Sequence, residues 1–261
     1  MTETQIKFDD GAAYEKMMGV WSRIAGAIFL DWLAPARGKR WVDIGCGNGA
    51  FTELIMQRCA PAQVKGIDPS EGQLAFARAR GGARGAEFVQ GDAMSLPLAD
   101  KSFDVAAMAL VLFFVPQPKR GIAEMMRVVG PGGIIGAYVW DIPGGGFPLE
   151  VLWAAMRAAG IPVPLPPSAS ISDMAALKQS FVDSGLDAIE TKVIEVERDF
   201  AGFEEFWDIA LLAPGIGATI KALPAKDHEA LKAKVREGLK AGSGKLTAAG
   251  KANAIKARVR A

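Results

Sequence analysis

The amino-acid sequence predicts an α/β protein built on a doubly wound, mostly parallel β-sheet. With 261 residues, half of them hydrophobic, the chain is long enough to bury a sizeable core. Short apolar segments alternate with longer amphipathic ones along most of it, as strands and helices do in parallel sheets. The first apolar segment also runs straight into a glycine-rich loop followed by a helix, which is the position where such sheets bind ligands.

The first half of the chain contains the clearest alternation. Residues 12–33 have helical periodicity, with Asp9 or Asp10 available as the N-cap, and Pro35 and Gly38 end the helix. The expected elements that follow are strands at 41–44, 64–67, 86–90, 103–112 and 134–140, with helices at 50–59, 70–80 and 119–129. Because crossovers between parallel strands are right-handed, this order predicts helices on both faces of the sheet.

The second half is less regular. Residues 141–170 are rich in proline and glycine around a short helix near 149–159, and we interpret them as an insertion that covers one end of the sheet. The expected elements beyond it are helices at 172–184, 203–212 and 227–239 and strands at 188–196 and 252–259. The chain is therefore expected to form a single domain with four parts: an N-terminal helical part at 1–36, the regular core of the sheet at 37–141, the insertion at 142–172, and the remaining sheet and helices at 173–261.

Composition and charge argue against several functions. A formal charge of +1 disfavours a dedicated nucleic-acid binder, although basic residues outnumber acidic ones from Lys221 onward, which is typical of a solvated helix face. Cys46 and Cys59 are too few for a disulfide framework and lack metal-type spacing, so no metal is expected. The N-terminus lacks signal-peptide character, and the longest apolar run, 105–115, is too short to cross a bilayer. We expect a cytoplasmic protein without a nucleic-acid or membrane partner. The sequence does not predict the oligomeric state, and a homodimer is one of the options.

The glycine-rich loop at the end of the first strand is the strongest functional signal. It reads Asp43-Ile44-Gly45-Cys46-Gly47-Asn48-Gly49, and glycines there let the backbone turn sharply and approach a ligand closely. Dinucleotide-binding enzymes usually have G-x-G-x-x-G, whereas this loop has G-x-G-x-G preceded by Asp43. A carboxylate suits a ligand that carries an ammonium and a sulfonium better than one that carries a pyrophosphate. The structural alternative is a tight strand-to-helix turn that binds nothing.

Three further strand ends carry residues that suit an adenosyl ligand. Asp68 ends the second strand, where a carboxylate can accept hydrogen bonds from both ribose hydroxyls. Asp92 follows the third strand and suits the adenine amino group, while the N–H of Ala93 can donate to a ring nitrogen. The carbonyls of Ala109 and Leu110, at the end of the fourth strand, suit an ammonium. Each residue alone is equally a cap or turn residue, but their order at successive strand ends indicates a site for a cationic adenosyl ligand.

Four segments of the sequence resemble a known family. They read VDIGCGNG, GIDPSEGQL, FVQGDAMSLPLADKSFDVAAMALVLFFV and MMRVVGPGGIIGAYVW. Together they are similar to class I S-adenosylmethionine-dependent methyltransferases, specifically the small-molecule group that resembles the ubiquinone/menaquinone C-methyltransferases. The resemblance covers roughly residues 10–141 without large gaps.

This resemblance implies S-adenosyl-L-methionine as the cofactor and a seven-stranded Rossmann-like sheet whose last strand runs antiparallel. By carry-over, Asp43 and the loop glycines line the methionine portion, Asp68 the ribose, and Asp92 the adenine. Segment 14–23 resembles the N-terminal lid helix of such proteins, which implies that Tyr14 and Arg23 reach the methionine end; a merely packed helix face is the alternative. The full set of expected cofactor contacts is Tyr14, Arg23, Asp43, Gly45, Cys46, Gly47, Gly49, Asp68, Pro69, Asp92, Ala93, Met94, Ala109 and Leu110.

The expected acceptor pocket is apolar and lies near the ends of the fourth and fifth strands. Its expected residues are Phe113, Phe114, Trp140 and Asp141. Each aromatic side chain either stacks on a flat or hydrophobic substrate or belongs to the core. If Phe113 and Phe114 follow directly on a strand, their side chains point to opposite faces and one of them faces the site. Many relatives have a histidine in this segment, whereas the single histidine here, His228, lies in a polar helix and is expected on the surface.

The sequence therefore predicts methyl transfer to a small organic molecule by in-line displacement. A general base is needed only for an acceptor that arrives protonated; Asp141 and Tyr14 are candidates, and neither is assigned. Two alternatives stay open: a non-catalytic S-adenosylmethionine-binding protein of the same fold, and a nicotinamide-dependent oxidoreductase, which the glycine spacing disfavours. Within the methyltransferases, near-neutral charge speaks against RNA, and no N/D-P-P-Y/F motif indicates amino-directed nucleic-acid methylation.

Overall fold

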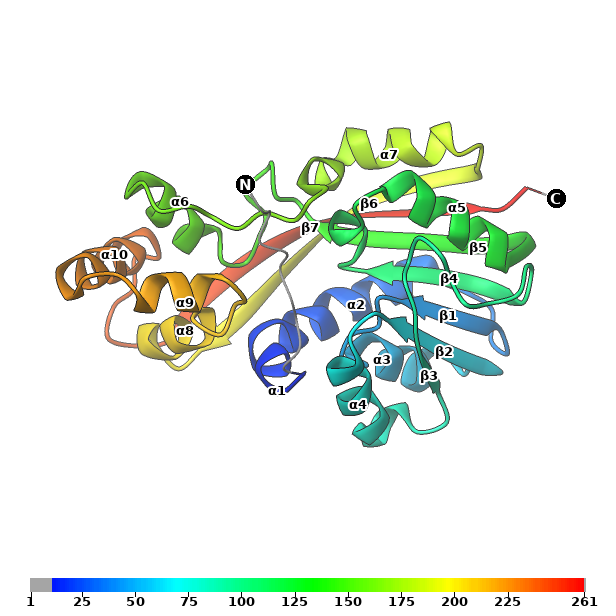
Figure 1. Cartoon of the computed structure of the whole chain (residues 1–261), viewed down its shortest axis with the longest axis horizontal. Coiled ribbons are helices and arrows are strands. Elements are labelled where there is room, and N and C mark those ends of the chain that lie inside the picture. The colour runs from blue at the N-terminus through cyan, green and yellow to red at the C-terminus, as the bar shows by residue number, and fades with distance from the viewer. Residues whose placement is uncertain (1–10, 261) are drawn as a thin grey trace.

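The computed structural model describes residues 11–260, and its centre is one seven-stranded β-sheet (Figure 1). The strands are β1 (Arg40–Ile44), β2 (Gln63–Asp68), β3 (Glu87–Gln90), β4 (Phe103–Ala109), β5 (Val129–Trp140), β6 (Asp187–Phe200) and β7 (Leu246–Arg258). Their order across the sheet is β3-β2-β1-β4-β5-β7-β6. Neighbours pair in parallel except around β7, which runs antiparallel to both β5 and β6. The predicted seven-stranded, mostly parallel sheet with an antiparallel last strand is confirmed.

Helices cover both faces of this sheet. The α-helices are α1 (Gly11–Tyr14), α2 (Val20–Leu33), α3 (Ala50–Cys59), α4 (Glu71–Ala79), α5 (Pro118–Val128), α6 (Glu150–Ala158), α7 (Met174–Asp183), α8 (Phe203–Ala210), α9 (Ile216–Lys221) and α10 (Ala225–Gly238). The other helical turns are η1 (Glu15–Gly19, π-helical) and three 3-10 turns, η2 (Gly81–Ala83), η3 (Leu112–Phe114) and η4 (Ala169–Ser172). Figure 1 shows α5 and α7 on one face, and α2, α3 and α4 on the other. Within residues 11–260, no helix has the length and apolar character needed to span a membrane.

The N-terminal helical segment runs without a break from α1 through η1 to α2. It covers the helix expected at 12–33, while the expected caps, Asp9 and Asp10, lie outside the described residues. The helix ends where Ala34 adopts a left-handed conformation with φ of 47° and its N–H donates to the carbonyl of Leu30 at 3.0 Å. Pro35 follows, so the helix stops where the sequence predicts.

The hairpin of β6 and β7 extends beyond the rest of the sheet. Both strands are longer than the expected 188–196 and 252–259, because the alternation of buried and exposed side chains continues to Phe200 in β6 and begins at Leu246 in β7. Helices α8, α9 and α10 lie between these strands in the chain, and Figure 1 shows them with α6 at the far end of the hairpin. We call these four the cap helices. The sequence does not predict α9, because six residues are too few to show a helical period.

The fourth strand is shorter than expected. The sequence predicts a strand at 103–112, but β4 ends at Ala109, because Leu110 adopts a φ of 61°, a left-handed conformation outside the β region. The chain then forms the 3-10 turn η3 over Leu112–Phe114. The expectation that Phe113 and Phe114 follow a strand and point to opposite faces is therefore wrong.

Some of the basic residues near the C-terminus form ion pairs. Lys232 and Arg236 both pair with Glu204, and Lys251 pairs with Asp141.

Aromatic side chains fix helix α2 to the sheet. Phe29 is fully buried, and its ring centre lies 4.9 Å from that of Tyr138 on β5 and 6.0 Å from that of Phe51 on α3. Gly136 on β5 makes room for it, because a Cβ there would lie 2.9 Å from the Phe29 ring. Gly136 and Tyr138 of β5 therefore fix the position of α2. Helix α2 in turn places the segment before it against the end of β1.

Replacing Phe29 with alanine is expected to lower the free energy of unfolding by about 3–5 kcal/mol, because it leaves a cavity between three elements. Val182→Ala is the control, since Val182 is 47% exposed, and its effect should stay within about 0.5 kcal/mol. Chemical denaturation followed by circular dichroism measures both. Equal effects of the two substitutions would contradict the importance of this packing.

Candidate functional site

The glycine loop at the end of β1 adopts a left-handed backbone that glycine accepts without strain. Gly45, Gly47 and Gly49 have φ of 73°, 51° and 79°. The N–H of Gly45 donates to the carbonyl of Ile67 on β2 at 2.7 Å. A Cβ on Gly45 would overlap the side chain of Val111, which follows β4. The loop is therefore fixed by the two strands on either side of β1.

Asp43 lies directly before this loop and is fully buried. Its Oδ2 accepts a hydrogen bond from the Thr52 hydroxyl at 2.6 Å, while no hydrogen bond from the described residues reaches Oδ1. Burial raises the pKa of Asp43 to about 7; the hydrogen bond from Thr52 opposes the rise, and the charge of Asp68 adds to it. A cation stabilises a buried carboxylate with an unpaired oxygen, so Asp43 fits the cationic ligand that the sequence predicts.

Asp68 ends β2 and holds the loop from the other side. Its Oδ2 accepts a hydrogen bond from the N–H of Gly47, and its Oδ1 from the N–H of Ser70, both at 2.9 Å. Burial raises the pKa of Asp68, and the two backbone hydrogen bonds oppose the rise. Each carboxylate oxygen has a second lone pair, so these bonds leave room for a ribose diol. Asp68 thus also shapes the loop, a role that the sequence does not predict.

Asp92 follows β3 and forms a turn. Its Oδ1 accepts a hydrogen bond from the N–H of Met94 at 2.7 Å, and its side chain is exposed. Ala93 and Met94 are half-buried. Among the other residues expected to contact the cofactor, Cys46 is buried and Pro69 is exposed. The adenine role of this turn stays a prediction.

The end of β4 is strained where the carbonyls are expected. Leu110 is 5% exposed and has a positive φ of 61°, which is unusual for a bulky residue. Its N–H donates to the carbonyl of Tyr138 on β5 at 2.8 Å, which holds the turn in place. Strained backbone of this kind is concentrated at functional sites, so Ala109 and Leu110 remain the residues we expect to bind an ammonium.

Tyr14 lies in the N-terminal helical segment and is half-buried. Burial of its hydroxyl raises the pKa of Tyr14 to about 12; a hydrogen bond with Ser22 opposes the rise, and nearby carboxylates, including Asp68 and Asp43, add to it. The hydroxyl is therefore close enough to both site carboxylates to be affected by their charge. This position agrees with the lid that the resemblance implies.

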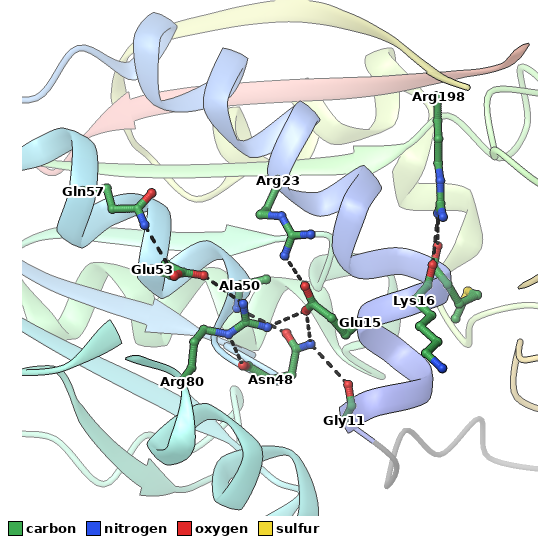
Figure 2. A network of polar contacts seen from close by, with 11 residues as sticks. Gly11, Glu15, Lys16, Arg23, Asn48, Ala50, Glu53, Gln57, Arg80 and Arg198 are labelled. Carbon is green, nitrogen blue, oxygen red and sulfur yellow. Dashed lines mark hydrogen bonds and ion pairs between the residues drawn. The ribbon is translucent and has the colours of Figure 1, made fainter. Parts of the chain in front are cut away.

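The sequence did not reveal a polar network that joins this segment to the loop (Figure 2). Its centre is Glu15, which accepts hydrogen bonds from Arg23 in the same segment, from Asn48 Nδ2 of the loop at 2.7 Å, and from Arg80 at the end of α4. Arg23, expected at the cofactor's methionine end, is thus paired with Glu15 here. No sequence signal pairs these residues, because Asn48 and Arg80 follow Glu15 by 33 and 65 positions.

The aromatic residues expected in the acceptor pocket are largely packed. Phe113 is buried and Phe114 is half-buried, and their ring centres lie 4.5 Å apart, edge to face. Trp140 is buried at the end of β5, with its ring centre 6.3 Å from that of Trp21 on α2, also edge to face. Its Nε1 has no hydrogen-bond partner among the described residues. Trp140 thus lies against the N-terminal segment.

Asp141 forms a turn at the end of β5. Its Oδ1 accepts a hydrogen bond from the N–H of Gly144 at 2.9 Å, and its Oδ2 pairs with Lys251 Nζ at 2.8 Å. Asp141 is therefore a turn residue, which is one of the two interpretations that the sequence allowed. An open hollow of about 630 Å³ lies nearby and is lined by Ile24, Gly144, Gly145, Gly146, Glu195, Val196, Glu197, Ala249, Gly250 and Lys251. The four residues expected in the acceptor pocket do not line this hollow.

Comparison of sequences finds methyltransferases that match part of the chain. Residues 42–137 match the family model described as a methyltransferase domain. A fatty-acid O-methyltransferase of Mycolicibacterium smegmatis is 36% identical over 100 residues, which are 38% of this chain and 36% of the relative. A ubiquinone/menaquinone biosynthesis C-methyltransferase of Roseobacter denitrificans is 33% identical over 108 residues, 40% of this chain and 43% of the relative. The aligned part therefore spans less than half of either relative.

Solved structures share the fold over nearly the whole chain. A phosphoethanolamine N-methyltransferase 2 of Haemonchus contortus in complex with S-adenosyl-L-methionine has a TM-score of 0.57 at 16% identity, covering 95% of this chain and 56% of that one. The [4+2]-cyclase SpnF has a TM-score of 0.54 at 21% identity, covering 100% of this chain and 89% of that one. At such identities the likeness shows the fold alone.

The match assigns residues 42–137 to the methyltransferase domain family, whose methyl donor is S-adenosyl-L-methionine. The residues present fit that donor, because the buried Asp43 keeps one oxygen without a partner and three glycines open the loop backbone to a ligand.

Gly45→Ala is expected to weaken S-adenosylmethionine binding at least about tenfold, because its Cβ would overlap Val111 and shift the loop. Gly38→Ala is the matched control: Gly38 has nearly the same φ, 74°, but a Cβ there meets nothing within 4 Å. Both variants therefore carry similar backbone strain, about 1–2 kcal/mol. Calorimetric titration of the folded proteins measures the difference, and equal affinities would contradict the assigned loop.

The affinity for S-adenosylmethionine is expected to rise with pH up to about 7, by at most about tenfold per pH unit. Burial holds Asp43 protonated below that pH, and a cationic ligand requires the ionised form, so binding releases a proton. Asp43→Asn should remove this dependence, because the amide oxygen still accepts from Thr52 but carries no charge. Titrations between pH 5.5 and about 7 test this, and an identical slope in the variant would refute it.

Proposed function

We propose that this protein transfers the methyl group of S-adenosylmethionine to a small organic molecule whose acceptor atom arrives already ionised. The observation that carries the proposal is the buried carboxylate of Asp43, which keeps an unpaired oxygen directly before the glycine loop. When bound, the cofactor supplies an electrophilic methyl carbon on a sulfonium whose leaving group is a neutral thioether. The chain then has to align the acceptor with that carbon and exclude water.

Four strand ends would hold the cofactor part by part. Asp43 balances the positive charge of the methionine portion, and the carbonyl of Leu110 accepts from its ammonium. Asp68 accepts from the ribose hydroxyls with the lone pairs that Gly47 and Ser70 leave free. Asp92 and its turn bind the adenine edge. The carboxyl ends of parallel strands meet at one edge of the sheet, so these roles require no rearrangement of the core.

The two candidates for a general base are poorly suited to that role. The pKa of Tyr14 is raised to about 12, so its hydroxyl keeps its proton at neutral pH and does not act as a base there. Asp141 is paired with Lys251 and accepts from a backbone N–H. The single histidine, His228, lies in α10 with its ring 5.6 Å from that of Trp207. We therefore infer an acceptor that needs no deprotonation in the site.

Carboxylates and acidic phenols meet this requirement, because both are ionised near neutral pH. One relative in sequence is a fatty-acid O-methyltransferase, and its name describes an acceptor with a carboxyl group. We propose a hydrophobic carboxylic acid or acidic phenol as the acceptor.

Two other functions, cofactor binding without methyl transfer and nicotinamide-dependent oxidoreduction, can be distinguished from this one by an experiment. The [4+2]-cyclase SpnF shares the fold, so the fold alone leaves open a chain that binds the cofactor without methyl transfer. A nicotinamide-dependent oxidoreductase is disfavoured, because the buried Asp43 would lie beside a pyrophosphate of the same sign. Formation of S-adenosylhomocysteine that depends on an acceptor distinguishes methyl transfer from both.

The proposal is tested with a panel of three acceptor types, a medium-chain fatty acid, an acidic phenol and a primary amine, at neutral pH. Mass spectrometry detects S-adenosylhomocysteine and the methylated product. We expect product from the fatty acid or the phenol and none from the amine, which is protonated at that pH. Binding of S-adenosylmethionine without turnover of either anion, or turnover of the amine alone, would contradict the proposed acceptor class.

Asp68→Ala is expected to weaken S-adenosylmethionine binding by about 1–3 kcal/mol, since it removes a charged acceptor for the ribose and a support of the loop. Asp104→Ala is the control, because Asp104 lies at the opposite end of the sheet, where it pairs with Arg40 at 2.9 Å. Calorimetry gives both affinities, and circular dichroism verifies the fold. Unchanged affinity in folded Asp68→Ala would remove this residue from the site.

A further inference from the structure

One carboxylate of the N-terminal segment joins three parts of the molecule (Figure 2). Glu15 accepts hydrogen bonds from Arg23 in its own segment, from Asn48 of the glycine loop, and from Arg80 after α4. The side chain of Arg80 is only 10% exposed, and that of Glu15 is 24% exposed. Because water is largely excluded from this pair, its attraction is screened less than that of a surface ion pair.

The turn that carries Glu15 brings the carboxylate back towards the loop. Residues Glu15–Gly19 form the π-helical turn η1, a rare conformation that is frequent at functional sites. A Cβ on Gly19 would lie 2.6 Å from Glu15 Oε2, the oxygen that binds Asn48 and Arg80. Glycine at this position therefore leaves the space that the carboxylate occupies.

The opposite side of the same turn is held by β6. Arg198 Nη1 donates to the carbonyls of Lys16 and Met17, at 3.1 Å each (Figure 2). Because β6 belongs to the hairpin that leads to the cap helices, the turn lies between that hairpin and the glycine loop. Its position is therefore fixed from both sides by polar contacts.

We propose that Glu15 is a positioning residue that latches the turn η1 (Glu15–Gly19) over the glycine loop, acting through Asn48 and Arg80. The inference rests on the proposed function, because a latch at this position retains S-adenosylmethionine and S-adenosylhomocysteine in the site. Either molecule enters or leaves only when the turn moves away from the loop. Loss of the latch therefore accelerates dissociation.

A neighbouring ion pair separates this role from ordinary stabilisation. Glu53 on α3 binds the same arginine, with its Oε2 2.8 Å from Arg80 Nη1. Its other side-chain hydrogen bond is from Gln57, also on α3, so Glu53 joins Arg80 to α3 rather than to the N-terminal segment. Glu53→Gln thus removes one ion pair of Arg80 while Glu15 keeps its own contacts with Arg23, Asn48 and Arg80.

The first test measures how fast radiolabelled S-adenosylmethionine leaves the full-length protein when it is chased with unlabelled cofactor. Glu15→Gln should dissociate about tenfold faster than the wild type, the effect of about 1.4 kcal/mol. Glu53→Gln should stay within about twofold of the wild type. Equal rates for Glu15→Gln and Glu53→Gln, or slower release from Glu15→Gln, would overturn the latch.

Gly19→Ala provides a second variant that keeps every charge. Alanine favours helix more than glycine does, so the segment should fold at least as well, and thermal unfolding verifies this. Its Cβ nevertheless displaces the Glu15 carboxylate. Faster cofactor release at an unchanged or higher melting temperature supports the latch, since a merely structural role predicts the opposite. Wild-type release from Gly19→Ala would refute it.

Limited trypsin digestion tests the latch without any cofactor. Lys16 is exposed within the turn, so cleavage after it reports how often the turn opens. Glu15→Gln and Gly19→Ala should be cleaved there about tenfold faster than the wild type and Glu53→Gln, as identified by mass spectrometry of the fragments. If the wild type fails to bind S-adenosylmethionine, the proposed function falls, and these cleavage rates still decide the latch.

Discussion

Burial of one carboxylate is the constraint on which the rest of the site depends. Asp43 has no exposed surface, and an ionised carboxylate in such an environment is costly unless a partner compensates it. Thr52 supplies one hydrogen bond, and the second oxygen is left for a cation. The loop that follows has glycine at three positions, each with a left-handed φ that glycine adopts without strain. Strong attraction also requires little water, which explains a helical segment packed over the loop.

The two sides of the site balance charge in different ways. On the cofactor side, burial raises the pKa of both Asp43 and Asp68, so their negative charge is best compensated by a bound cation. At the end of β5, by contrast, Asp141 is already compensated by Lys251. Under the proposed function, the cofactor supplies the cation that Asp43 lacks, and an acceptor that brings its own negative charge meets the sulfonium rather than a side-chain base.

The sequence predicted the features that depend on local pattern. Helix α3, the sheet from β1 to β5 and the glycine loop all follow from periodicity and from the order of strand ends. The early end of β4 could not be predicted, because a left-handed Leu110 leaves no signal in the composition. The contacts of Glu15 could not be predicted either, since long-range ion pairs depend on the three-dimensional placement of α4 and the loop. The sequence predicted only part of β6 and β7. The buried side of β7 consists largely of alanine and glycine, which are weakly hydrophobic, so its full length was not recognised.

The N-terminal segment combines two kinds of attachment, and their physics differs. Helix α2 is held by buried aromatic packing around Phe29, and detaching it would expose apolar surface to water at a high cost. The turn η1 buries Met17 and Met18, and it is also held by charged and carbonyl contacts from Arg80, Asn48 and Arg198, groups that water solvates well when they separate. Loss of the polar contacts is therefore less costly than exposure of the buried methionines or of the aromatic packing around α2. Under the proposed latch, the polar contacts are the part that opens first, and the apolar packing is the part that anchors the segment.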